Sequence, residues 1–251
     1  MMEQEINAIV QWLQKQVDET NTNGLIVGVS GGLDSAVVAY LIQRACPDRS
    51  LAAIMPINTS HANMEDARKV VEGAGIDHVT IDLTETQELM YSHIAKMIRQ
   101  KGDFSPENDQ LAAANLRARL RMSTLYTLAT HYHYLVVGTD NASEWHTGYF
   151  TKYGDGGVDI QPIIDFTKRE VREMAIALGV PDDVVYKQPS ADLWEGQTDE
   201  AEMGVAYDVI DAYLKGMEIP KKDQERIEMM HTRTAHKREP LPKFRRPSFD
   251  Q

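Results

Sequence analysis

The chain has 251 residues, of which 42% are hydrophobic and 25% charged, as is typical of a globular protein that buries its own core. Its net charge of -12 argues against a nucleic-acid-binding surface, and no segment has the ~20 consecutive apolar residues of a membrane span. The single cysteine, Cys46, excludes an intrachain disulfide and a multi-cysteine zinc site. Since the first residues do not resemble a signal peptide, we expect a cytoplasmic protein.

Hydrophobic periodicity predicts alternating helices and strands over the first 140 residues. The predicted helices cover residues 4–17, 35–44, 61–72, 85–99 and 111–130, with a polar loop at 101–110. The predicted strands cover residues 25–29, 51–55, 78–81 and 134–138. Such alternation is typical of βαβ units and predicts an α/β fold with a mostly parallel sheet flanked by helices.

The pattern changes after residue 142. Residues 145–157 are rich in Gly, Thr, Tyr and Asp without periodicity, which predicts a mobile loop that covers a ligand. Helices are then expected near 168–178, 199–214 and 224–235. We therefore expect one domain over residues 1–251, with a helical C-terminal extension.

The segment between the first strand and its helix reads Ser30-Gly31-Gly32-Leu33-Asp34-Ser35. Two glycines allow the backbone to approach an anion closely. The free amides at the helix N-terminus would then point at that anion. Asp34 would repel that anion, so we expect Mg²⁺ between carboxylate and phosphate. The plainer interpretation is a βα turn with an aspartate near the helix N-cap.

This segment is neither a Walker loop nor a G-x-G-x-x-G dinucleotide fingerprint. The string S-G-G-x-D-S resembles the pyrophosphate-binding loop of the N-type ATP pyrophosphatases. That resemblance implies cleavage of ATP to AMP and diphosphate, with activation of an oxygen as an adenylate. The loop alone leaves the acceptor undetermined.

Three further segments narrow the choice of acceptor. The 138–144 segment, Gly-Thr-Asp-Asn-Ala-Ser-Glu, follows the fourth strand, so Thr139 and Glu144 should lie near the glycine loop. Glu144 is a candidate second magnesium ligand, or simply an acidic residue at a helix N-terminus. In the 147–160 segment, Lys152 is available for an anion. Residues 229–246 form a basic tail, which could reach over a phosphate or simply be exposed.

Six strings together closely resemble the NAD⁺ synthetase family: SGGLDS, NLRARLRM, GTDNASE, TGYFTKYGDGGVDI, PSADLWEGQTDE and a late HK pair. The family resemblance implies an adenine nucleotide alpha hydrolase-like, Rossmann-like fold. It also implies ATP-dependent amidation of deamido-NAD⁺ to NAD⁺, with Mg²⁺ as cofactor and a homodimer as the assembly. No glutaminase domain precedes these strings, so we expect the short form that uses ammonia.

The family's residue roles carry over by motif. Asp155 falls at the position that binds ammonia or accepts its proton, and Lys168 at an ATP-binding, catalytic position; Asp34 and Glu144 are the magnesium ligands. Ser190 stands where the family often has Thr. The ATP-binding residues are Gly28, Val29, Ser30, Gly31, Gly32, Leu33, Asp34, Ser35, Thr139, Lys168 and Ser190, and the residues for deamido-NAD⁺ are Arg119, Lys152, Asp159, His236 and Lys237.

Two classes of alternative remain at this point. Another ATP pyrophosphatase, such as a GMP synthetase or a tRNA thiolase, shares the loop. A thiolase, however, should carry more cysteines and a basic face, and a GMP synthetase should lack TGYFTKYGDGG. A non-catalytic nucleotide-binding module would need neither both acidic metal ligands nor a covering loop.

Overall fold

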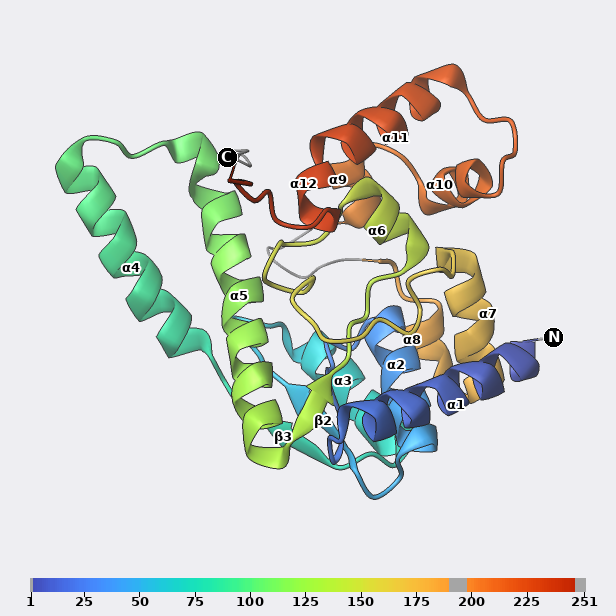
Figure 1. The fold of residues 1–251 in the computed structure, drawn as a ribbon. Helices are drawn as coiled ribbons and strands as arrows, with labels where there is room; N and C mark the ends of the chain where they lie inside the picture. Colours follow the sequence, from blue (N-terminus) through green and yellow to red (C-terminus); the bar gives the residue numbers. More distant parts are fainter. Residues whose placement is uncertain (1, 190–197, 247–251) are drawn as a thin grey trace, which may run out of the picture.

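The computed structural model describes residues 2–189 and 198–246, and a four-stranded parallel sheet lies at its centre (Figure 1). The strand order is β3-β2-β1-β4, with β1 parallel to both of its neighbours. The strands are β1 (Gly24–Gly28), β2 (Ser50–Ile54), β3 (His78–Thr80) and β4 (Tyr134–Val136). The predicted α/β fold with a parallel sheet is confirmed.

The central strand β1 is buried on both faces. Leu25 and Val27 belong to one apolar cluster, whereas Ile26 belongs to a second cluster on the opposite face. Successive side chains of a strand point to opposite faces, so a continuous apolar run fills both layers. Polar groups of a site can therefore lie only beyond the ends of this strand, and the residues after its carboxyl end include Ser30 and Asp34.

Helices cover both faces of the sheet (Figure 1). The helices of one layer pack on the sheet face to which Leu25 points. In the other layer, α5 packs on the face to which Ile26 points, and α4 packs against α5. The first layer holds α1 (Met2–Thr20), α2 (Leu33–Ala45), α3 (His61–Ala74), α7 (Lys168–Leu178) and α8 (Asp182–Val185). The second holds α4 (Thr84–Lys101) and α5 (Pro106–Tyr132).

The C-terminal extension has a core of its own, in which Met203, Ile210 and Ile227 are buried together. Helices α10 and α11 also pack against the short helix α6, which follows β4. The elements are α6 (Ala142–Thr147), α9 (Asp199–Met203), α10 (Tyr207–Leu214), α11 (Lys221–Arg233) and α12 (Ala235–Arg238). None of the helices within residues 2–189 and 198–246 is long and apolar enough to cross a bilayer.

Several predicted boundaries were wrong. Helix α5 begins at Pro106, inside the predicted 101–110 loop, because proline is well suited to the first helical turn. The predicted 199–214 helix is two helices, separated at Gly204, whose φ of 69° ends the first. Helix α8 was not predicted, and α6 extends into the segment expected to be irregular from residue 145.

Candidate active site

A cavity of about 660 Å³ lies where the carboxyl ends of β1, β2 and β4 meet. This is the edge at which open parallel sheets bind ligands. Every predicted site residue within the described part of the chain lines this cavity, except Gly31 and Asp159. Ser190 lies outside the described residues, so its predicted contact with ATP stays a prediction.

The loop after β1 is held in shape by its two serines. The hydroxyls of Ser30 and Ser35 lie 3.1 Å apart, and the amide of Ser30 donates to Ser35 Oγ over 3.2 Å. Ser30 Oγ also accepts a hydrogen bond from the amide of Gly32. The hydroxyls therefore stabilise the loop itself.

Each of the two glycines of this loop is required for a different structural reason. Gly31 has φ of 80°, and a Cβ there would lie 2.8 Å from backbone atoms of Asn63 and Ala67 in α3. A side chain would thus be strained and would clash. Gly32 is the N-cap of α2 and supplies no side-chain cap to the first helical amides. Those amides suit an anion in the cavity.

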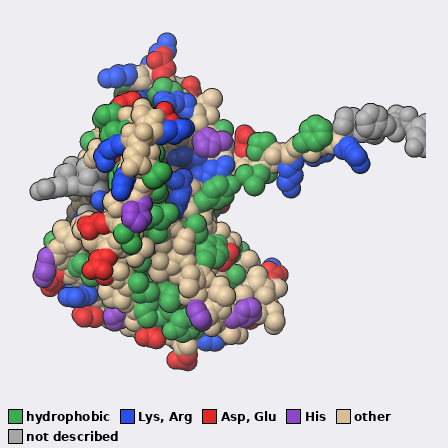
Figure 2. All heavy atoms as spheres, turned by 90° about the vertical axis from the view of Figure 1, so that its left-hand side faces the viewer, with side chains coloured by type: hydrophobic (Ala, Val, Ile, Leu, Met, Phe, Trp, Pro, Cys, Tyr) green, Lys and Arg blue, Asp and Glu red, His purple; other side chains and the backbone are tan. Residues whose placement is uncertain are grey.

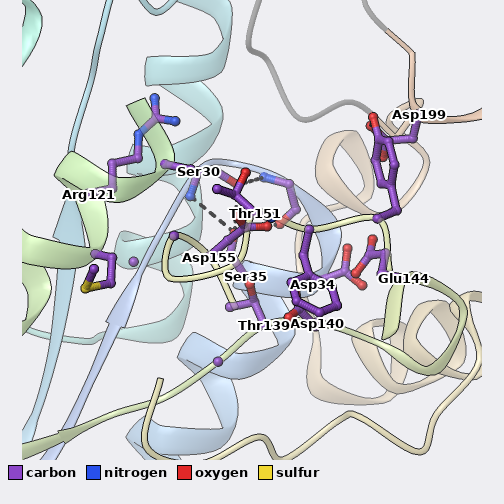
Figure 3. A pocket seen from close by; sticks show the side chains of 18 of the residues that line it. Ser30, Asp34, Ser35, Arg121, Thr139, Asp140, Glu144, Thr151, Asp155 and Asp199 are labelled. Atoms are coloured by element: carbon purple, nitrogen blue, oxygen red, sulfur yellow. Dashed lines mark hydrogen bonds between the residues drawn. The ribbon is translucent and has the colours of Figure 1, made fainter. Parts of the chain in front are cut away.

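Lys168 joins the two predicted metal ligands. Its Nζ atom donates to Asp34 Oδ2 over 2.5 Å and to Glu144 Oε1 over 3.1 Å (Figure 3 shows the two carboxylates facing each other). Lys168 is only 4% exposed. Burial alone would lower the pKa of Lys168, but the two carboxylates outweigh it and raise the pKa. The lysine is therefore a permanent cation at the loop.

Asn141 positions both carboxylates and was not among the predicted site residues. Its Nδ2 donates to Asp34 Oδ1 over 2.9 Å, and its side chain also caps α6. The backbone amide of Asn141 in turn donates to Glu144 Oε2, which completes a capping box. Glu144 thus has the helix N-terminal role considered from sequence, and its role as a magnesium ligand stays a prediction. The signal that could have identified Asn141 is the N-x-x-E spacing before a helix.

The C-terminal extension reaches the same carboxylate. The hydroxyl of Tyr207, which is 4% exposed, donates to Glu144 Oε1 over 3.1 Å. It also lies 3.2 Å from Asp199 Oδ2, and Lys168 Nζ lies 4.7 Å from the Tyr207 ring centroid. No sequence pattern predicted this contact, because Tyr207 reads as a core residue of α10.

The charge of this cluster fits a divalent cation. Burial, with Asp34 nearby and Lys168 opposing, raises the pKa of Glu144 to about 7. A divalent cation beside Asp34 and Glu144 would lower the pKa of Glu144 again and hold both carboxylates ionised. No group of three or more His, Cys, Asp or Glu suited to a metal occurs among the described residues. Mg²⁺ bound with substrate phosphates needs only one or two carboxylates, so the residues fit it.

Asp155 lies in the irregular segment after α6. Its Oδ1 accepts a hydrogen bond of 2.9 Å from the amide of Thr151, and its carboxyl is open to the cavity (Figure 3). Surrounding protein atoms raise the pKa of Asp155, whereas the Thr151 amide opposes the rise. A carboxyl group with a raised pKa is better suited to accept a proton.

The basic residues predicted to bind the dinucleotide connect this segment to other helices. Lys237 Nζ donates to Gly148 O over 2.7 Å and to Phe150 O, so α12 is tied to the segment. Arg119 of α5 donates to Lys152 O over 3.3 Å, and Lys152 Nζ donates to His236 O. The 148–158 segment is thus enclosed between α5 and α12.

Asp159 lies apart from this group. Its Oδ1 accepts from the hydroxyl of Tyr126 and its Oδ2 from the amide of Val136, over 2.9 and 2.8 Å. These bonds join the segment to α5 and β4 rather than to the cavity. Its predicted contact with deamido-NAD⁺ stays a prediction.

Comparisons with known proteins agree with this geometry. A family model described as NAD synthase matches residues 5–241. An NH₃-dependent NAD⁺ synthetase of Alkaliphilus metalliredigens is 52% identical over 239 residues, covering 94% of this chain and 97% of that protein.

Solved structures with the same fold include two that cover most of this chain. The NMN synthetase of Francisella tularensis has a TM-score of 0.88 at 38% identity, covering 99% of both chains. The NAD⁺ synthetase of Burkholderia pseudomallei has a TM-score of 0.78 at 28% identity, covering 95% of this chain and 90% of that one. With a family model spanning nearly its whole length and a relative at half identity, this chain belongs to the NAD synthase family.

Proposed function

We propose that the protein catalyses ATP-dependent amidation of deamido-NAD⁺ with ammonia, giving NAD⁺, AMP and diphosphate through an acyl adenylate. The observation that carries this proposal is Lys168 held between Asp34 and Glu144, next to the phosphate loop and inside the cavity. Membership of the family removes the GMP synthetase and thiolase alternatives, and makes a non-catalytic module untenable.

The first step joins the nicotinate carboxylate to the α-phosphorus of ATP, with release of diphosphate. The loop amides and Lys168 place cationic and N–H groups where negative charge develops, and these groups are already oriented in the free protein. Asp34 and Glu144 would hold Mg²⁺. When bound, that ion neutralises phosphate charge during phosphoryl chemistry.

The second step forms the amide. Ammonium loses a proton to Asp155, ammonia attacks the acyl carbon, and the carbon–oxygen bond to AMP breaks. The departing phosphate of AMP takes the second proton that nitrogen must lose. Water would hydrolyse the adenylate, so the 148–158 segment acts by enclosing it. Its anchors are Lys237, which bonds to Gly148 and Phe150, and Arg119, which bonds to Lys152.

The direct test incubates the protein with ATP, Mg²⁺, ammonium and deamido-NAD⁺ and measures NAD⁺ and AMP. We expect equal amounts of both products, and none with Asp34→Ala, which removes a loop carboxylate. Release of AMP with a different acceptor, without NAD⁺, would overturn the proposal.

A second candidate substrate is nicotinate mononucleotide. The observation that favours it is the TM-score of 0.88 to an NMN synthetase, against 0.78 to an NAD⁺ synthetase. Both substrates present the same nicotinate carboxylate, so the reacting groups are unchanged. Comparing kcat/KM for the mononucleotide and the dinucleotide under identical conditions decides between them.

We also propose a homodimer. Helix α4 exposes Leu89 and Met97, at 61% and 62%, on a face with Met90, Ile94 and Ile98. Figure 2, which views the molecule from the side of α4 and α5, shows apolar side chains gathered on this face. Exposed apolar patches of this kind mark interaction surfaces. Light scattering should give twice the monomer mass, and Met97→Glu should reduce it to that of the monomer.

A further inference from the structure

Asp140 is a buried carboxylate at the cavity, next to the proposed metal ligands but not one of them. It lies between β4 and α6, lines the cavity and is 5% exposed. Its Oδ2 atom has no hydrogen-bond partner among the residues that the structure describes. Burying such an oxygen is costly unless a donor satisfies it, and native proteins almost always supply one. A cavity-lining oxygen of this kind indicates that the donor belongs to a ligand.

Charged groups from four segments surround Asp140. Burial, then Asp155, Glu144 and Asp34, raise the pKa of Asp140, whereas Lys237 of α12 lowers it. Figure 3 shows Asp140, Asp155 and Asp34 around the same part of the cavity. Lys237 already donates to the carbonyls of Gly148 and Phe150. Lys237 lowers the pKa of Asp140 and of Asp155, and Arg121 lowers that of Asp155, yet both pKa values stay raised. A further cation beside the two carboxyl groups would favour their charged forms.

The ligand that satisfies Asp140 must bring N–H or O–H donors and a positive charge. The phosphates of ATP and of a dinucleotide bring acceptors and negative charge, which would be repelled here. The divalent cation is already assigned to Asp34 and Glu144. Ammonium, among the reactants, has four N–H donors and one positive charge in a volume close to that of water.

Building on the proposed function, in which Asp155 accepts the proton of ammonium, we propose that Asp140 is a second carboxylate of the ammonium-binding site. Asp140 holds the ion by a charge-assisted hydrogen bond, and Asp155 takes its proton. Ammonium becomes ammonia as the Asp155 carboxylate becomes a carboxylic acid. The freed nitrogen lone pair then forms the carbon–nitrogen bond, and AMP leaves with the electron pair of the broken carbon–oxygen bond. The second proton that nitrogen loses passes to the departing phosphate of AMP, which leaves the neutral amide.

The test compares Asp140→Asn with wild type in two reactions. With ammonium, we expect the KM for ammonium to rise roughly 10- to 100-fold, the usual worth of a hydrogen bond to a charged group. The KM values for ATP and the dinucleotide should stay unchanged. With hydroxylamine, which is uncharged at neutral pH, hydroxamate formation should be retained, because a neutral nucleophile needs no carboxylate to hold it.

An unchanged KM for ammonium would overturn the proposal, and so would an equal loss with both nucleophiles. Asp208→Asn, an exposed aspartate of α10 outside the cavity, is the matched control and should behave as wild type. ATP-dependent diphosphate release shows that the Asp140→Asn variant is folded. If that release is absent, the Asp140→Ser variant is tested in its place. Failure of wild type to form any amide would instead contradict the proposed function.

Discussion

Lys168 and Asp34 are separated by 134 positions in the sequence, yet Lys168 Nζ donates to Asp34 Oδ2 over 2.5 Å. Each residue lies in the first turn of its helix, α7 and α2, and both helices begin at the cavity. Since Lys168 and Asp34 are 4% and 16% exposed at their side chains, water screens this ion pair little. The pair therefore couples the phosphate loop to the second half of the chain.

Replacing Lys168 with methionine should leave two buried carboxylates without their cation. We expect the free energy of unfolding to fall by roughly 3–5 kcal/mol, as when one partner of a buried ion pair is removed. Mg²⁺ should stabilise this variant more than wild type, because its binding supplies the missing charge. Urea unfolding with and without Mg²⁺ measures both effects.

The control for that experiment is Arg169→Met. Arg169 pairs with Glu173 over 3.5 Å at the surface, where both side chains are more than half exposed. We expect a change of about 0–1 kcal/mol and no dependence on Mg²⁺. Equal losses in the Lys168 and Arg169 variants would contradict the buried-pair interpretation.

Asp155→Asn should separate the two chemical steps. The Asn side chain keeps the approximate shape and can still accept from Thr151, but it cannot take a proton from ammonium. We expect amide formation to fall roughly 10²- to 10⁴-fold, the usual contribution of general base catalysis. Diphosphate release should fall much less. Single-turnover assays follow each product, and parallel losses would remove the role as a proton acceptor.

Gly148→Ala should disturb the contact between α6 and the C-terminal helices. Gly148 has φ of 69°, and a Cβ there would lie 2.2 Å from the Thr234 hydroxyl oxygen. The expected cost is roughly 1–2 kcal/mol for the backbone, plus 1–3 kcal/mol for overpacking. Substrate binding should weaken as well, because Lys237 bonds to Gly148 O.

Gly102→Ala is the matched control, because Gly102 has φ of 84° but no atom within 4 Å of an added Cβ. It should show the backbone cost alone and leave the KM values unchanged. Thermal unfolding of the two variants isolates the packing contribution. A Gly148 variant no less stable than the Gly102 variant would show that Thr234 moves aside freely.

His146 should make the protein sensitive to acid. Burial, followed by the nearby His231 and Arg238, lowers the pKa of His146 to about 4 from its ordinary 6.5. The His146 and His231 rings stack at 4.2 Å. Between those two pKa values the unfolded chain binds the proton and the folded protein does not. His146 therefore reduces stability progressively as pH falls from 6.5 towards 4.

His146→Gln should remove this dependence on pH. Between neutral pH and pH 5, the wild type should lose about 2 kcal/mol of its free energy of unfolding through His146, and the variant should not. The measurement is the free energy of unfolding at several pH values between 5 and 7.5, for wild type and variant. His131→Gln, an exposed histidine near the end of α5, serves as the control. Parallel curves for wild type and the His146 variant would contradict the prediction.

The amino-acid sequence by itself determined the fold class and the motif residues. Short apolar runs such as residues 25–29 are typical of parallel strands that are buried on both faces, and the polar residues that follow them indicate loops. Residues within one motif, such as the Ser30–Ser35 loop, are close in space because they are close in the chain. The boundaries of helices were predicted less accurately than their existence. Pro106 begins a helix and Gly204 ends one, although the pattern of polar and apolar residues indicates neither boundary.

Only the tertiary structure decided which motifs meet. Tyr207 and Asn141 read as an apolar helix residue and a helix cap, yet both bond to the acidic groups beside Lys168. Asp159, in contrast, is turned towards Tyr126 and Val136. Side-chain partners more than 20 positions apart depend on how helices pack on the sheet, and no local pattern in the sequence records that packing.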